Sequence, residues 1–315
     1  MADTEIIRIG TRGSPLALYQ ANLIADELER LSQGRVAGQI VTFTTKGDQL
    51  TTERLINSGG KGLFTREIDR AVDVGEVHIG VHSLKDVPSL LPDSQSIVAY
   101  PPREDPRDGF VTVNGVKRLH DLPQGATLGT ASLRREAQAL ALRPDLNVIP
   151  FRGSVGTRMD KLKDGQADAT FLAMAGLIRL EMGEAATPVP MEDMLPAAGQ
   201  GIICVAAHYD GLTPAMADAL GLLDDSLTRA MATAERAFLA ELDGSCRTAM
   251  AAQLRVRAGK WWLKGEVLAP DGQQRWTAEG TALLSSSLEE LSALGRHLGV
   301  SIRDQAGGDL PVFED

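Results

Sequence analysis

Cysteines, aromatic residues and long apolar runs are all scarce in this chain of 315 residues. The two cysteines, Cys204 and Cys246, exclude a disulfide framework or a four-cysteine metal site and favour a reducing compartment. Aromatic residues make up only 4% of the sequence, so the core must be mainly aliphatic. No stretch approaches the roughly 18 consecutive apolar residues of a membrane span, and the N-terminus lacks a signal-peptide pattern. These absences predict a cytoplasmic protein without a membrane partner.

Basic charge is also in deficit. The 32 Lys and Arg residues face 42 Asp and Glu residues, which gives a formal net charge of −10 at pH 7. This balance argues against a nucleic-acid-binding protein, so an anionic ligand must be met by a local basic pocket. The five histidines are scattered without the spacing of a zinc site, and we therefore expect no metal.

Short β-branched runs alternate with amphipathic helical patterns through most of the chain. This alternation predicts βαβ units and a largely parallel sheet. Ser14 and Pro15 have the pattern of a helix N-cap followed by the first helical position. Proline-rich segments at 100–106 and 187–196 interrupt the alternation, and we interpret them as crossings between two α/β lobes with a hinged cleft. The expected strands lie at 6–10, 36–43, 77–82, 127–130, 147–151, 168–172 and 202–206.

The pattern changes near residue 224. A long helical stretch runs to Leu242, and three strand patterns separated by tight turns predict an antiparallel meander. Leucines at helical spacing from Leu288 to Leu298 predict a final helix that covers one face. The expected fold is therefore two α/β domains and a smaller α+β domain with a three-stranded antiparallel sheet. The expected domains are 1–101 with 197–221, 102–196, and 222–315.

Arginines follow several of the expected strands. The carboxyl ends of strands in open α/β sheets are where ligands bind, and a guanidinium holds a carboxylate or phosphate in a bidentate fork. This placement predicts a polyanionic ligand; the alternative is a set of surface arginines in ordinary ion pairs. The residues concerned are Arg12, Arg134, Arg135, Arg152, Arg158 and Arg179, with Ser14, Ser132, Ser154, Gly153 and Gly156 beside them.

Asp86 is the acidic residue best placed for catalysis, since it follows a strand end and has the cationic neighbour Lys85. The alternative is an Asx turn before Pro88. Cys246 lies in a small polar turn, where it is either a reactive thiol or an inert loop cysteine. Cys204 lies in an apolar strand and is interpreted as a buried filler.

Eight segments match one family in order. They are IGTRGSPLA (9–17), GGKGLF (59–64), VHSLKDVP (81–88), GTASLRR (129–135), RGSVGTR (152–158), AGLIR (175–179), LPAAGQG (195–201) and LDGSC (242–246). The chain therefore resembles the hydroxymethylbilane synthases, also called porphobilinogen deaminases, over essentially its full length. The resemblance implies two hinged domains like those of periplasmic binding proteins and a third domain that carries the cysteine.

The resemblance also implies an activity. Enzymes of this family join four porphobilinogen molecules head to tail, release ammonia at each addition, and hydrolyse off the linear tetrapyrrole hydroxymethylbilane. The product grows on a dipyrromethane cofactor, which is attached by a thioether to the residue that matches Cys246. Each pyrrole ring brings an acetate and a propionate, so an arginine-rich site suits the growing chain. Relatives are typically monomers, and no metal is required.

Site residues follow by position. Asp86 matches the catalytic aspartate, and Lys85 beside it is expected to be catalytic as well. The implied cofactor-binding residues are Ser83, Lys85, Asp86, Ser132, Arg134, Arg135, Arg152, Gly153, Arg158 and Cys246. The implied substrate-binding residues are Arg12, Ser14, Lys61, Phe64, Arg152, Arg158, Arg179 and Gln200.

The chain departs from the family pattern at a few positions. Asn57 stands where relatives can carry lysine, Ala249 stands where proline is usual, and 202–206 replaces a stretch richer in glycine. A competing interpretation is an intracellular anion-binding or effector module with the same two-lobed fold. Such a module would not need a covalently loaded Cys246.

Overall fold

The computed structural model describes residues 4–49, 62–242, 249–307 and 310. The chain divides into two compact units. The first unit takes in the N-terminal segment with Gly62–Glu104 and Gly201–Arg229, and the second takes in Asp105–Gln200 and the segment from Ala230 onward. The second unit thus takes in most of the predicted second domain together with the predicted third domain from Ala230 onward, and the division into three domains stays a prediction.

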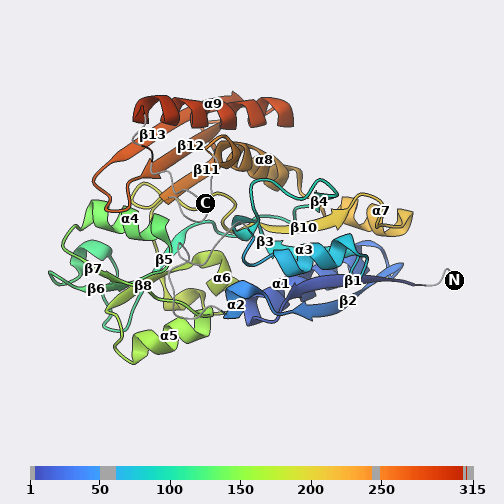
Figure 1. Ribbon diagram of the computed structural model, residues 1–315, viewed down its shortest axis with the longest axis horizontal. Helices are drawn as coiled ribbons and strands as arrows, with labels where there is room; N and C mark the ends of the chain where they lie inside the picture. Colours follow the sequence, from blue (N-terminus) through green and yellow to red (C-terminus); the bar gives the residue numbers. More distant parts are fainter. Residues whose placement is uncertain (1–3, 50–61, 243–248, 308–309, 311–315) are drawn as a thin grey trace. The chain divides into compact units, whose positions relative to one another are not determined.

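The first unit contains a five-stranded sheet of order β2-β1-β3-β10-β4 (Figure 1). Strands β2 and β3 run parallel to β1, whereas β10 runs antiparallel to both of its neighbours, β3 and β4. The strands are β1 (Glu5–Arg12), β2 (Val36–Phe43), β3 (Ile79–Ser83), β4 (Gln95–Ala99) and β10 (Ile203–His208). The helices are α1 (Pro15–Leu31), α2 (Lys46–Gln49), α3 (Arg66–Asp73) and α7 (Pro214–Leu223).

Helix α1 begins as the sequence predicts. The Ser14 hydroxyl accepts a hydrogen bond from the Ala17 N–H at 3.3 Å, and Pro15 occupies the first turn, where its missing N–H costs nothing. Apolar side chains three to four residues apart along α1 pack on the sheet together with side chains of α7. This core includes Ile7, Ile9, Ala21, Ile24, Leu28, Ile79, Val205, Met216 and Leu220.

The second unit contains a five-stranded sheet of order β7-β6-β8-β5-β9. Strands β7 and β8 run parallel to β6, and β5 runs antiparallel to β8 and β9. The strands are β5 (Asp108–Thr112), β6 (Thr127–Gly129), β7 (Asn147–Ile149), β8 (Ala169–Ala173) and β9 (Thr187–Pro188). The helices are α4 (Leu133–Leu142), α5 (Val155–Lys163) and α6 (Met174–Arg179).

The two sheets have the same strand pattern although the sequence shows no repeat. Each sheet has one antiparallel strand, which is β10 in the first unit and β5 in the second. Each of these strands is the first that the chain forms after a crossing into that unit. The expectation of largely parallel sheets is therefore corrected to mixed sheets. Strands β4 and β5 are not among the expected strands, because neither of these short strands is followed by a helical pattern that would mark a βαβ unit.

The antiparallel meander is confirmed as β11 (Ala249–Arg257), β12 (Lys260–Leu268) and β13 (Arg275–Leu283). Ala258 and Gly259 join β11 to β12 with φ of 49° and 73°, the left-handed conformation that a tight two-residue hairpin turn requires. One face of the meander packs on α8 (Ser226–Glu241) and α9 (Leu288–Ala306). The apolar residues that join these elements are Phe238, Leu254, Trp261, Leu263, Val267, Leu291, Leu298 and Ile302.

The expected fold class is thus confirmed: two α/β sheets and a three-stranded antiparallel sheet with helices. The stretch before Leu242 holds helix α8, and helix α7 precedes it where no helix was expected. Over the ranges that the structure describes, every helix is too short or too polar to span a bilayer.

Candidate functional site

Several predicted site residues of the first unit lie at the carboxyl ends of neighbouring parallel strands. Strand β1 ends at Arg12 and strand β3 ends at Ser83, and the two strands are in register at Gly10 and Gly80. Carboxyl ends of parallel strands meet at one edge of a sheet, so these side chains share that edge. The Ser83 hydroxyl is held by the Gln20 side-chain amide of α1 at 2.9 Å.

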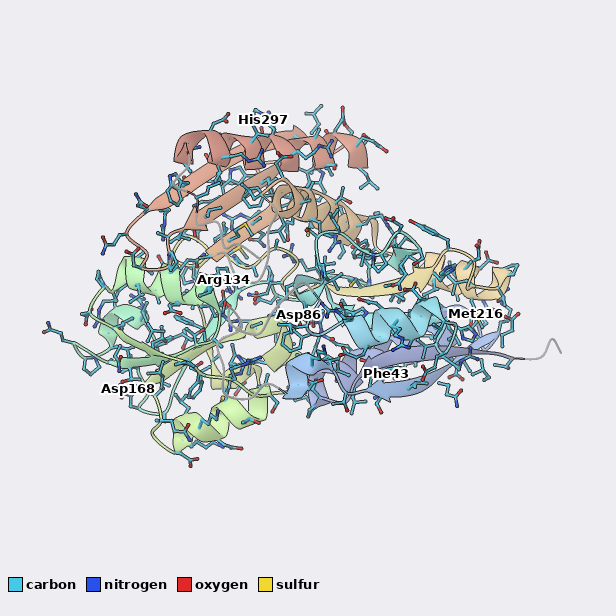
Figure 2. All side chains as sticks on the ribbon, viewed as in Figure 1. Phe43, Asp86, Arg134, Asp168, Met216 and His297 are labelled. Atoms are coloured by element: carbon cyan, nitrogen blue, oxygen red, sulfur yellow. The ribbon has the colours of Figure 1, made fainter. Side chains whose placement is uncertain are left out.

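Asp86 lies on a 3-10 turn, Leu84–Asp86, directly after β3 (Figure 2). The turn is fixed by backbone hydrogen bonds, from the Leu84 N–H to the Ile202 carbonyl and from the Val87 N–H to the Leu84 carbonyl. An Asx turn at Asp86 would need the N–H of Pro88, which proline lacks. That alternative therefore fails. Within the described ranges the half-buried Asp86 carboxylate makes no hydrogen bond or ion pair.

Arg12 is held in place by two neighbours. Its Nε lies 3.2 and 3.3 Å from the two carboxylate oxygens of Asp48, and its guanidinium lies over the Phe64 ring, 4.5 Å from the centroid. Although burial opposes the shift, hydrogen bonds from Arg12 and Thr45 lower the pKa of Asp48. Phe64, itself an implied substrate-binding residue, thus contacts the substrate-binding candidate Arg12.

A buried histidine and a carboxyl group lie under this edge. His82 Nε2 is 3.6 Å from Asp69 Oδ1, which is too long for a hydrogen bond. Burial and the charge of Arg12 lower the pKa of His82 to about 4. Burial, aided by the carboxylates of Asp73 and Glu67, raises the pKa of Asp69 to about 6. Between these two values both groups are neutral.

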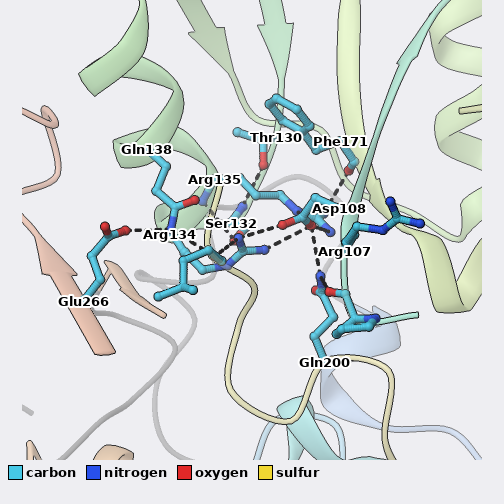
Figure 3. A network of polar contacts seen from close by, with 12 residues as sticks. Arg107, Asp108, Thr130, Ser132, Arg134, Arg135, Gln138, Phe171, Gln200 and Glu266 are labelled. Atoms are coloured by element: carbon cyan, nitrogen blue, oxygen red, sulfur yellow. Dashed lines mark hydrogen bonds and ion pairs between the residues drawn. The ribbon is translucent and has the colours of Figure 1, made fainter. Parts of the chain in front are cut away.

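Asp108 is the centre of the site in the second unit, and the sequence analysis did not single it out (Figure 3). It is fully buried at the start of β5. Its Oδ2 accepts from Arg134 Nη1 at 2.7 Å, and its Oδ1 accepts from Arg135 Nη2 at 2.7 Å and Arg135 Nε at 2.9 Å. Despite the opposing effect of burial, the two arginines hold the pKa of Asp108 far below its usual range.

Arg134 and Arg135 lie in the first turn of α4, which Ser132 caps. Their exposed fractions are only 5% and 6%, so they are not the surface arginines of the alternative interpretation. Nothing in the local sequence pairs them with Asp108, which lies 26 residues before Arg134. The one sequence signal for Asp108 is that an acidic residue begins an apolar run directly after the proline-rich crossing.

Gln200, a predicted substrate-binding residue, is 1% exposed and belongs to this same network. Its Nε2 donates to the Pro106 carbonyl at 2.8 Å and to Asp108 Oδ1 at 3.2 Å. Gln200, at the end of the segment Asp105–Gln200, is therefore hydrogen-bonded to the beginning of the same segment.

The remaining predicted arginines also lie in the second unit. Arg152 follows β7 and Arg179 ends α6, and their exposed fractions are 9% and 8%. Arg158 lies in α5, whose N-cap Ser154 accepts from the Thr157 N–H at 3.2 Å. Gly153 has φ of 121°, and a Cβ there would lie 2.7 Å from Thr157, so this position requires glycine.

Glu235 is a further buried residue that the sequence analysis missed. Its Oε2 accepts from the Gly199 N–H at 2.7 Å and its Oε1 from the Leu254 N–H at 2.9 Å. One carboxylate of α8 thereby fixes both the segment that carries Gln200 and strand β11.

Some predictions lie outside the described residues, namely those for Lys61, Asn57 and Cys246. Cys204 is fully buried in β10, opposite His82, as expected of a core residue. Across the ranges given above, no group of three or more His, Cys, Asp or Glu side chains could hold a metal ion.

Comparison with known proteins gives one result over nearly the whole chain. A family model described as "Porphobilinogen deaminase, dipyromethane cofactor binding domain" matches residues 7–212, and "Porphobilinogen deaminase, C-terminal domain" matches 230–304. The porphobilinogen deaminase of Nitrobacter hamburgensis is 44% identical, over 97% of this chain and 95% of the relative. Those of Paracoccus denitrificans and of Pisum sativum, the latter chloroplastic, are 45% and 43% identical over 96% of this chain, and over 95% and 83% of the relatives.

Solved structures that resemble the chain include a TRAP periplasmic solute binding protein from Desulfovibrio salexigens, with 12% sequence identity and a TM-score of 0.44. That match covers 70% of this chain and 73% of the other. The two family models and the relatives give the same family that the eight ordered motifs indicate. The chain belongs to the porphobilinogen deaminase family.

Proposed function

We propose that this chain is a hydroxymethylbilane synthase that joins four porphobilinogen molecules head to tail on a dipyrromethane primer. Ammonia leaves at each addition, and hydrolysis releases the linear tetrapyrrole at the end. The observation that carries the proposal is the match of the cofactor-binding-domain model to residues 7–212, a range that contains both Asp86 and the Arg134–Arg135 pair. The anion-binding module is not favoured, because relatives that match nearly the full chain are named as deaminases.

The residues present fit a polycarboxylate primer. Dipyrromethane consists of two linked porphobilinogen units, each with an acetate and a propionate. Arg134 Nε is buried and has no hydrogen-bond partner in the described part of the chain, so one strong donor awaits an acceptor. When bound, the primer supplies the pyrrole terminus to which the first substrate is added. We propose that Cys246 holds it by a thioether, and that Ser83, Lys85, Ser132, Arg134, Arg135, Arg152, Gly153 and Arg158 surround it.

Asp86 is the proposed catalytic residue. Loss of ammonia leaves a positive charge spread over the substrate's pyrrole ring and its nitrogen. A fixed carboxylate stabilises that charge and exchanges the pyrrole N–H proton. The Asp86 carboxylate suits this task because no neighbour in the described part of the chain occupies it and because its turn is fixed by backbone hydrogen bonds. Lys85 is its neighbour in the chain and is the second proposed catalytic residue.

Substrate carboxylates are proposed to bind at the remaining cationic positions. Arg12 is oriented by Asp48 and Phe64, which lowers the entropy lost when it grips a carboxylate. The other proposed contacts are Ser14, Lys61, Arg152, Arg158, Arg179 and Gln200. The net charge of −10 supports a protein without nucleic-acid or anionic-membrane partners. We further propose a cytoplasmic monomer.

Intact mass spectrometry tests this proposal. The wild-type protein should exceed its polypeptide mass by the primer, and limited porphobilinogen should add a series of equal increments, each one substrate less ammonia. Cys246→Ser should have the bare polypeptide mass, whereas the matched control Cys204→Ser should carry the primer. An active wild type without the adduct, or an adduct retained in Cys246→Ser, would contradict the assignment.

A further inference from the structure

One buried carboxylate serves both arginines of the pair that opens α4. Arg134 donates from Nη1 to Asp108 Oδ2 at 2.7 Å and from Nη2 to Oδ1 at 3.1 Å. Arg135 donates from Nε at 2.9 Å and from Nη2 at 2.7 Å, both to Oδ1 (Figure 3). Each guanidinium is thus fixed at two points by the same acid, which sets its plane as well as its place.

Backbone carbonyls also accept hydrogen bonds from the two arginines. Arg134 Nη1 also donates to the Leu195 carbonyl at 2.9 Å, and Arg135 Nη1 donates to the Phe171 carbonyl at 2.8 Å. Each arginine has five N–H groups, and three of each are committed in this way. The donors left over include the buried Arg134 Nε, which finds no acceptor in the portion of the chain described. The geometry thus leaves the pair with donors to offer a ligand.

The net charge of the buried site also depends on Asp108. Two guanidiniums and one ionised carboxylate amount to a net charge of +1 in a site whose three members are at least nine-tenths buried. Without Asp108 the same buried space would hold two uncompensated positive charges, which is strongly unfavourable. With it, the pair stays positive enough to attract a carboxylate and remains in one conformation before any ligand arrives.

The network also reaches the sheet that follows the proposed attachment cysteine. The Leu195 carbonyl accepts one hydrogen bond from Arg134 and a second from Gln138 Nε2 at 3.0 Å. Gln138 Nε2 also donates to Glu266 Oε1 on β12 at 2.9 Å. Strand β12 pairs along its whole length with β11, which begins three residues after Cys246. The arginine pair is therefore tied to the sheet whose first strand follows the proposed attachment cysteine in the sequence.

We infer that Asp108 is a positioning residue for the primer: it holds Arg134 and Arg135 so that their remaining donors face a dipyrromethane carboxylate. The inference rests on the proposed function and deepens it. Asp108 touches neither primer nor substrate and acts only through the two arginines.

The test measures how fast the apoprotein acquires the primer from porphobilinogen, by intact mass, together with the melting temperature. Asp108→Glu keeps the charge but moves the carboxylate by one methylene. It should melt within about 5 °C of wild type, and its loading rate should fall at least tenfold because the guanidiniums are displaced. Asp108→Asn leaves both guanidiniums uncompensated, so it should load slowly and also melt lower than Asp108→Glu.

Asp145→Glu and Asp145→Asn are the matched controls, since Asp145 pairs with Arg143 in the same unit but near its surface. Both should load like the wild type. If Asp108→Asn does not fold, Asp108→Glu carries the test alone. Loading of either folded Asp108 variant at the wild-type rate, or an equal loss in the Asp145 controls, would overturn the inference. A wild-type protein that never acquires an adduct would instead refute the proposed function.

Discussion

Replacing Glu235 by glutamine tests whether one buried carboxylate fixes the segment beside the arginine site. The Gly199 N–H donates to one oxygen of Glu235 and the Leu254 N–H donates to the other. Glutamine has a single carbonyl oxygen, so in either orientation its NH2 group faces one of these N–H groups. The variant keeps the size of the side chain and removes one acceptor.

The expected loss of stability follows from those two contacts. A buried N–H left without an acceptor costs about 1 to 3 kcal/mol, and the second hydrogen bond loses its charge assistance, which is worth about 1 kcal/mol. Together Glu235→Gln should lower the free energy of unfolding by about 2 to 4 kcal/mol. For a unit of this size that corresponds to a fall in melting temperature of about 4 to 16 °C.

Differential scanning calorimetry of the wild type and the variant measures this change. Glu241→Gln is the matched control, because Glu241 ends the same helix and pairs with Arg303, whose side chain is 51% exposed. An ion pair of that kind contributes at most about 1 kcal/mol, so the control should melt close to the wild type. If Glu235→Gln melts no lower than Glu241→Gln, the two backbone contacts do not stabilise the segment as argued.

The remaining predictions concern the chemistry and its pH dependence. Asp86→Asn, assayed on protein whose loading has been checked by mass, should fold and bind substrate while kcat falls on the order of a hundredfold; wild-type turnover would show that another group supplies the charge. Arg158→Leu and Arg179→Leu should accumulate short adducts after limited substrate, whereas a uniform modest loss of affinity without trapped adducts would contradict a role for these arginines in chain elongation. Asp69→Asn should make the urea-derived free energy of unfolding fall more steeply as pH drops from about 6 to 4. In the wild type, acidification lowers the free energy of unfolding through His82, whose pKa is lowered to about 4 in the folded protein. It raises the free energy of unfolding through Asp69, whose pKa is raised to about 6. Equal slopes in wild type and variant would contradict this offset.

Local sequence signals predicted the elements that depend on neighbouring residues alone. The N-cap at Ser14 and the antiparallel meander that ends at Leu283 are both present, because capping and turn formation need only residues a few positions apart. The motifs likewise placed Arg12 and Asp86 at strand ends. Proline at position 88 even excluded the Asx turn at Asp86, although this consequence was not drawn from the sequence.

Partners far apart in the chain were decided by the tertiary structure. The direction of β5 and β10 depends on where the chain re-enters each sheet, which no local pattern records. The burial of Arg134 and its grip on Asp108 likewise arise because β5 lies beside β8 and α4 follows β6 in the same unit. Sequence periodicity reports which residues face a core, but it does not report which charged side chains meet there, because a hydrogen bond depends on position in space and not on separation along the chain.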